Sequence, residues 1–103
     1  MDIEQIRKDI AFGRFEFSRH AFHRAVERNI SAEEIIQAGT MAEVIEEYPN
    51  DKYLPSCLLA GFTREQRPLH MQVCYTDANI VKLITLYEPD PRQWTEYKKR
   101  RML

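Results

Sequence analysis

The 103-residue sequence is poor in glycine and in cysteine. Its three glycines are scattered, so no glycine-rich segment is present that could cradle a phosphate group. The two cysteines, Cys57 and Cys74, form no CxxC pair and lie in apolar runs. We therefore expect two buried free thiols rather than a disulfide framework or a cysteine-based metal site.

Long apolar runs and an excess of charge of one sign are also absent. No run approaches the roughly 20 apolar residues of a membrane-spanning helix, and the charged N-terminus is unlike a signal peptide. With 15 basic and 16 acidic residues, no strong overall field attracts nucleic acid. A composition of 44% hydrophobic and 30% charged residues is typical of a globular protein with a core. We expect a cytoplasmic protein with a single domain, residues 1–103.

The N-terminal part of the chain has the spacing of helices. A stripe of isoleucines predicts a helix over residues 2–12, which Gly13 ends. Ser31, followed three residues later by Glu34, is a capping box. This motif predicts a second short helix that ends at Gly39.

Between these two helices, residues 18–29 predict a third, with Ser18 as its N-cap. Phe22 and Val26 are four residues apart, so they share a face and are predicted to pack on the rest of the protein. Another face carries imidazole and guanidinium groups beside a carboxylate: His20, Arg24, Glu27 and Arg28. This stripe suits proton transfer beside a cation.

The C-terminal part has the pattern of strands joined by hairpins. The predicted strands are residues 44–48, 57–63, 69–75 and 80–87. Residues 94–101 predict a short helical turn with a basic end. Helices followed by hairpin-linked strands predict an α+β fold, in which N-terminal helices pack on a four-stranded antiparallel sheet.

Polar side chains are expected to gather on one face of this sheet. Alternation within strand 69–75 places its apolar residues on the core face and His70 on the less buried face. If His70 lies opposite Tyr87 in the last strand, then Gln72 lies opposite Thr85. This register puts an imidazole, an amide, a hydroxyl and a phenol on one patch.

Two other kinds of site are conceivable around the histidines. His20 and His23 are one helical turn apart and could share a metal ion with His70, and Cys74 could pair with His70 as a nucleophile. However, the sequence has no HExxH motif and no cysteine pair, and a thiol in a core strand is usually inert. We expect neither a metal ion nor a cofactor.

Several short motifs together resemble a bacterial family, the domain of unknown function 4258. They are His20-Ala21-x-x-Arg24-x-x-Glu27-Arg28-x-Ile30-Ser31, Val44-Ile45-Glu46, Tyr48-Pro49, Arg67-Pro68-Leu69-His70, Ile84-Thr85-x-Tyr87, Pro89-Asp90-Pro91 and Trp94. The family is similar to the RelE-like RNase toxins, which group with barnase, EndoU and colicin nuclease domains. The resemblance implies the RelE-like version of the fold above. It also implies a cognate antitoxin as a protein partner, and it nominates His20, Arg24, Arg28, His70, Thr85 and Tyr87.

These residues lead to the hypothesis of a metal-independent endoribonuclease, the toxin of a toxin–antitoxin system. RNA supplies its own 2′-hydroxyl as nucleophile, so the protein needs only an acid, a base and a stabiliser of charge. The expected catalytic residues are His20, Arg24, His70 and Tyr87, and the expected substrate-binding residues are Arg28, Gln72 and Thr85. The expected partner is RNA, including ribosome-bound mRNA, with no membrane contact. The alternative is a non-catalytic protein-binding module of the same fold.

Overall fold

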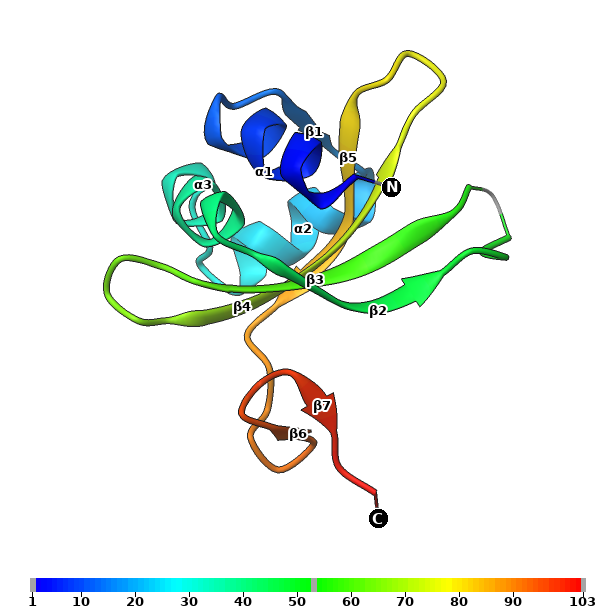
Figure 1. The fold of residues 1–103 in the computed structure, drawn as a ribbon. Helices are drawn as coiled ribbons and strands as arrows, with labels where there is room; N and C mark the ends of the chain where they lie inside the picture. The colour runs from blue at the N-terminus through cyan, green and yellow to red at the C-terminus, as the bar shows by residue number, and fades with distance from the viewer. Residues whose placement is uncertain (1, 53, 103) are drawn as a thin grey trace.

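The computed structural model describes residues 2–52 and 54–102 as three helices, a sheet and a short C-terminal hairpin (Figure 1). The elements are α1 (Ile3–Ala11), β1 (Phe15–Phe17), α2 (Arg19–Glu27), α3 (Ala32–Thr40), β2 (Glu43–Tyr48), β3 (Ser56–Phe62), β4 (Pro68–Tyr75), β5 (Val81–Tyr87), β6 (Trp94–Thr95) and β7 (Lys99–Arg100). The expected α+β class is confirmed. No helix in the described part of the chain is long and apolar enough to cross a membrane.

The helices begin where short polar side chains satisfy their first N–H groups. The Ser18 hydroxyl accepts a hydrogen bond from the N–H of Ala21, at 3.0 Å, and so starts α2. At the start of α3, Ser31 accepts from the N–H of Glu34 and the Glu34 carboxylate accepts from the N–H of Ser31. The predicted capping box is therefore confirmed, and the Ser31 N–H holds the pKa of Glu34 below its usual value.

The main sheet has the strand order β1-β5-β4-β3-β2. The four longer strands pair antiparallel, as expected. The prediction of a four-stranded antiparallel sheet is nevertheless wrong, because β1 adds a fifth strand that pairs parallel with β5, from Phe15 opposite Val81 to Phe17 opposite Leu83. Three extended residues contain too little pattern to reveal a partner so distant in the sequence.

All three helices lie on one side of this sheet, the helix face (Figure 1). The core between them includes Ile6 and Ile10 from α1, Ile35 from α3, and Leu59 and Met71 from the sheet. The expected free thiols are confirmed: Cys57 and Cys74 are both buried and unpaired, and burial raises the pKa of the Cys57 thiol to about 11.

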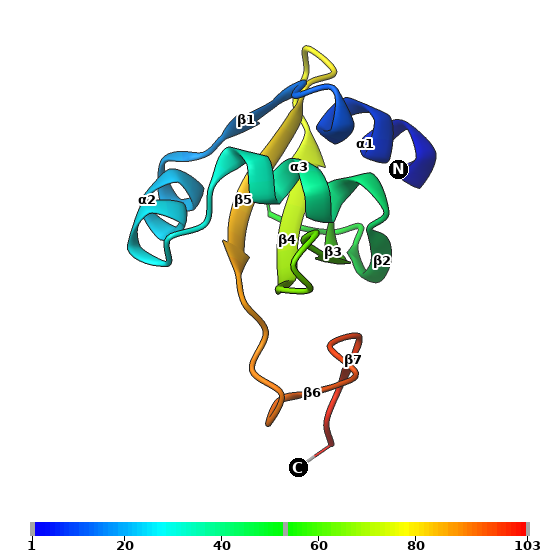
Figure 2. The ribbon, with the colours of Figure 1, turned by 90° about the vertical axis from the view of Figure 1, so that its left-hand side faces the viewer.

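The helix α2 lies beside β5 (Figure 2). Ala21 and Ala25 are buried, whereas Phe22 and Val26 are 56% and 66% exposed. The prediction that Phe22 and Val26 pack on the protein is wrong, because alanines on the neighbouring face let the helix backbone come close to the strand. The Ser18 hydroxyl also donates to the carbonyl of Ile84, at 2.9 Å, which ties the start of α2 to β5.

A bulge divides β5 into two parts. Strict alternation predicts Val81 and Leu83 on the same face as Tyr87. Instead, the register between β4 and β5 shifts beside Val73 and leaves Ile84 without a partner. Val81 and Leu83 consequently face the core, while Tyr87 points to the opposite side of the sheet.

The side of the sheet that carries His70 and Tyr87, here called the strap face, is crossed by the C-terminal strap, residues 89–102 (Figure 1). The strap contains the hairpin of β6 and β7, so the prediction of a helical turn over residues 94–101 is wrong. Its turn has positive φ at Glu96 and Tyr97, 53° and 62°, as a type I′ turn requires. The usual Asn-Gly signal for that turn is absent from the sequence.

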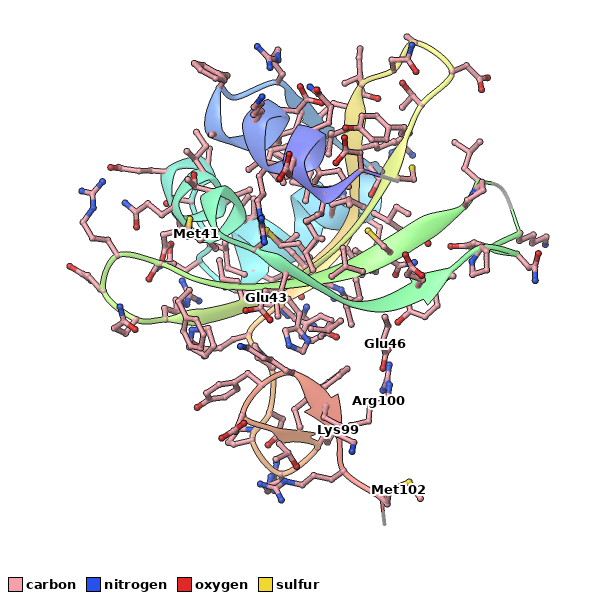
Figure 3. The ribbon with its side chains drawn as sticks, in the orientation of Figure 1. Met41, Glu43, Glu46, Lys99, Arg100 and Met102 are labelled. Atoms are coloured by element: carbon pink, nitrogen blue, oxygen red, sulfur yellow. The ribbon has the colours of Figure 1, made fainter. Side chains whose placement is uncertain are left out.

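Ion pairs connect the strap to the edge strand β2. Arg100 donates to both carboxylate oxygens of Glu46, at 2.7 and 3.1 Å, and Figure 3 shows the two side chains pointing toward each other. Lys98 pairs with Glu43 at 3.2 Å. The strap is thus fixed to a strand that precedes it by about half the chain.

Candidate functional site

His70 and Tyr87 form a hydrogen-bonded pair at the end of β4 and β5. They are cross-strand partners, and Gln72 is the partner of Thr85, so the predicted register is confirmed. The Nδ1 atom of His70 lies 3.2 Å from the Tyr87 hydroxyl oxygen. An imidazole and a phenol are therefore joined on the strap face.

The contacts of His70 determine its tautomer. Its Nε2 atom is bonded to the backbone carbonyl of Tyr97, which can only accept, so Nε2 carries the proton. Nδ1 is then the acceptor of the Tyr87 hydroxyl proton. A neutral imidazole in this position can take up a proton from the phenol.

The strap covers this imidazole. The Trp94 ring stands edge-on to the His70 ring with centroids 4.5 Å apart, and His70 is fully buried. The prediction that His70 lies on the less buried side is wrong, because the sheet pattern contains no information about a segment that folds over it. Burial lowers the pKa of His70 below its ordinary value of 6.5.

This lowered pKa predicts that acid destabilises the protein through His70. The folded protein holds the imidazole neutral, whereas the unfolded chain protonates it near pH 6.5. The unfolded state therefore binds more protons, and the free energy of unfolding falls as the pH drops through and below that value. Urea unfolding of wild type and His70→Gln, compared between about pH 8 and about pH 5, is expected to show a wild-type advantage that shrinks with acid. A difference in the free energy of unfolding between the two proteins that does not change with pH would contradict this prediction.

Tyr87 opens into a pocket of about 410 Å³ between the sheet, the end of α2 and the strap. Half-buried, Tyr87 has a pKa raised by burial, so its hydroxyl keeps its proton near neutral pH. The other lining residues are Arg28, Arg67, Glu88, Asp90, Gln93, Trp94 and Arg100. The phenol is the group through which the buried His70 meets this pocket.

Three guanidinium groups line the pocket, but two of them already have carboxylate partners. Arg67 pairs with Glu34 at 3.0 Å and Glu88 at 3.3 Å, and Arg100 pairs with Glu46. Arg28 donates to the carbonyl of Leu86, at 2.8 Å, and makes no ion pair with any residue that the structure describes. Of the three, Arg28 is therefore the one whose charge is not neutralised by a described carboxylate and which can pair with an anionic ligand.

The predicted residues His20 and Arg24 lie elsewhere, on the outer surface of α2. His20 is exposed, and Arg24 pairs with Glu27 at 3.0 Å. Within residues 2–52 and 54–102, neither is hydrogen-bonded to His70 or Tyr87. The structure therefore brings together His70, Tyr87 and Arg28, and leaves Arg24 about one turn and His20 about two turns back along the helix from Arg28.

The other two predicted residues, Gln72 and Thr85, lie farther along the strap face. The Gln72 amide donates to the Ser56 hydroxyl at 3.0 Å and to the Asp51 carboxylate at 3.3 Å. Sequence reasoning missed Asp51 and Ser56, because they become neighbours of Gln72 only through sheet pairing. It also missed Arg67 as a lining residue, although Arg67 belongs to a recognised motif.

No metal site is evident in the described ranges, which contain no group of three or more His, Cys, Asp or Glu side chains arranged to hold an ion. His23, considered above as a ligand, stands beside the exposed Phe22 ring, with centroids 6.3 Å apart.

Comparison with known proteins identifies the family. Residues 17–88, more than half of the chain, match the model described as "Domain of unknown function (DUF4258)", and the chain belongs to that family. The match ends before the strap. Neither a curated protein nor a solved structure matches the chain.

Proposed function

We propose that the protein is a metal-independent endoribonuclease with a RelE-like fold, the toxin of a toxin–antitoxin pair. The observation that carries the proposal is the pocket in which the guanidinium of Arg28, with no ion pair among the described residues, lies beside Tyr87, with His70 bonded behind the phenol. A base and a cation at one pocket are what cleavage through the 2′-hydroxyl needs.

In this mechanism His70 acts through Tyr87. The 2′-hydroxyl gives its proton to the Tyr87 oxygen while the phenol proton moves to Nδ1 of His70, along the hydrogen bond already present. The 2′-oxygen attacks phosphorus, and Arg28 holds the phosphate oxygens as charge develops on them. The 5′-oxygen leaves with a proton from water in the open pocket.

The outer stripe of α2 supplies a path for the rest of the RNA. His20, Arg24 and Arg28 follow one another at four-residue spacing, which is about 6 Å along a helix. Imidazole and guanidinium groups at this interval suit contacts with successive phosphates of a strand whose scissile bond lies at Tyr87. The proposal thus retains His20 and Arg24 as strand-binding groups.

A direct test is cleavage of RNA by purified protein, free of any antitoxin, in the presence of EDTA. We expect cleavage of RNA and none of the same sequence made with 2′-deoxy sugars, because the nucleophile comes from the substrate. The assay uses bare RNA and translating ribosomes, since RelE-like enzymes act on ribosome-bound mRNA. Inactivity in both settings would reject the proposal.

The second candidate is a protein-binding module. The exposure of Phe22 and Val26 on α2 favours it, since an apolar pair on an outer helix face suits a partner protein. Phe22→Ser with Val26→Ser would then abolish the capture of a partner protein such as an antitoxin. An inactive protein that binds such a partner through these residues would establish the module instead.

A further inference from the structure

A second hollow, of about 460 Å³, lies on the strap face beside the Gln72–Thr85 pair. It is lined by Tyr48, Pro49, Asn50, Asp51 and Gln72. Its volume is within the range of roughly 300 to 1,000 Å³ that small-molecule sites occupy. Gln72 is two residues from His70 on β4, or about 7 Å along the strand. The hollow is therefore a close neighbour of the Tyr87 pocket.

An oriented carboxylate occupies one side of this hollow. A turn with a hydrogen bond from the N–H of Asp51 to the carbonyl of Tyr48, at 3.3 Å, brings Asp51 back toward the sheet. Its Oδ2 atom accepts from the Ser56 hydroxyl, at 2.7 Å, and from the Gln72 amide. Within the described part of the chain Asp51 makes no ion pair. It is a negative group held in place by neutral donors.

The hydrogen-bonding capacity that Asp51 and Gln72 leave unused in the hollow is that of acceptors, whereas the amide of Asn50 is both a donor and an acceptor. Among the described residues, the Oδ1 atom of Asp51 and the Oε1 atom of Gln72 form no hydrogen bond, and neither residue leaves a side-chain atom buried without a partner. Both atoms are therefore open to solvent or to a ligand. A ligand that bonds to both of these atoms must present hydrogen-bond donors, such as N–H groups.

The Tyr48 ring provides a flat surface in the same hollow. Its hydroxyl donates to Glu46, and Glu46 is in turn bound by Arg100 of the strap. The ring is thus held at its outer end. A fixed aromatic ring beside hydrogen-bond acceptors is how proteins bind a nucleic-acid base, by stacking on its face and bonding to its edge.

We propose that this hollow binds a guanine base, and so selects the RNA that reaches the Tyr87 pocket. Guanine alone presents two adjacent donors on its Watson–Crick edge, and the 2-amino group can donate to the unused Oδ1 atom of Asp51 while N1–H donates to the Oε1 atom of Gln72. The Watson–Crick edges of adenine and cytosine pair a donor with an acceptor, and uracil has one N–H between two carbonyls. The inference rests on the proposed function for its choice of RNA.

Binding of free nucleosides to the full-length protein tests the site without requiring cleavage. In amide NMR spectra we expect guanosine to shift the signals of Tyr48, Asn50, Asp51 and Gln72. Adenosine and uridine are expected to leave them unchanged. Inosine, which lacks the 2-amino group, is expected to bind at least about tenfold more weakly, because one hydrogen bond to a charged group is lost.

Asp51→Asn supplies the variant, and Glu47→Gln is its matched control. Glu47 is exposed, lies only four residues from Asp51 in the sequence, and is not among the lining residues, so its substitution removes the same charge nearby. We expect Asp51→Asn to lose guanosine binding and Glu47→Gln to keep it. If Asp51→Asn does not fold, the comparison of guanosine with inosine on the wild-type protein still tests the site: equal binding of the two would overturn the inference.

The outcomes separate this inference from the proposed function. Guanosine binding without RNA cleavage would reject the ribonuclease and leave the base site standing. Cleavage with no preference for guanosine over adenosine would overturn the base site and leave the ribonuclease. If L-arginine amide shifts the signals of Tyr48, Asn50 and Asp51 and guanosine does not, the hollow takes a protein side chain and the inference is wrong.

Discussion

Tyr87→Phe is expected to slow RNA cleavage at least about a hundredfold, the usual contribution of a general acid or base. The substitution removes one oxygen, and with it the link between the buried His70 and the pocket. Because Arg28 is untouched, affinity for RNA is expected to change little. Single-turnover cleavage, together with anisotropy of a 2′-deoxy strand, separates the two effects.

Tyr97→Phe is the control for that experiment. Tyr97 is also a tyrosine over the strap face, with its ring 6.0 Å from that of Phe62, but its contact with His70 is made by the backbone carbonyl. Removing its hydroxyl is expected to leave the rate unchanged. Equal rates for Tyr87→Phe and wild type would show that the phenol takes no part in the reaction.

Trp94→Ala is expected to lower the free energy of unfolding by about 3–5 kcal/mol, the usual range for a large aromatic side chain in a core. The indole is 3% exposed, packs on His70, and has the guanidinium of Arg100 4.6 Å from its centre. Removal leaves a cavity and gives water access to the imidazole. Urea unfolding followed by circular dichroism measures the loss.

Arg92→Ala is the matched substitution in the same segment. The Arg92 side chain is 89% exposed and pairs with Asp90 within the strap. We therefore expect the substitution to change the free energy of unfolding by no more than about 0.5 kcal/mol. Trp94 is the only tryptophan in the sequence, and its fluorescence in wild type reports whether the strap lies on the sheet. A Trp94→Ala loss below about 1 kcal/mol would mean that the strap contributes little to the fold.

Local signals in the sequence predicted those parts of the fold that depend on neighbouring residues. Ser18 and Ser31 satisfy N–H groups a few residues away, so the helix starts could be located. Alternation in β4 and in the last part of β5 was sufficient for the register that joins His70 to Tyr87, although the bulge at Ile84 was not predicted. That register was predicted because only one pairing gathers the polar side chains on one face.

Features that depend on distant segments could not be predicted in the same way. The partner of β1 is set by packing rather than by the three residues of the strand. The strap hairpin turns at Glu96 and Tyr97, two residues that seldom adopt positive φ. The burial of His70 follows from that hairpin. For the candidate site, the sequence therefore predicted the pairing of His70 with Tyr87. It predicted neither the strap that covers His70 nor the place of Asp51 beside Gln72.

The parallel pairing of β1 with β5 has a consequence for the order of folding during synthesis. The Ser18 hydroxyl that anchors α2 bonds to Ile84, 66 residues later in the chain, and β1 likewise has its partner in β5. A ribosome releases the N-terminal segment first, so α2 and β1 wait for their anchors until most of the chain has emerged. Contacts this far apart also slow folding. A chain released early would lack β5 and, with it, the support that holds α2 in place.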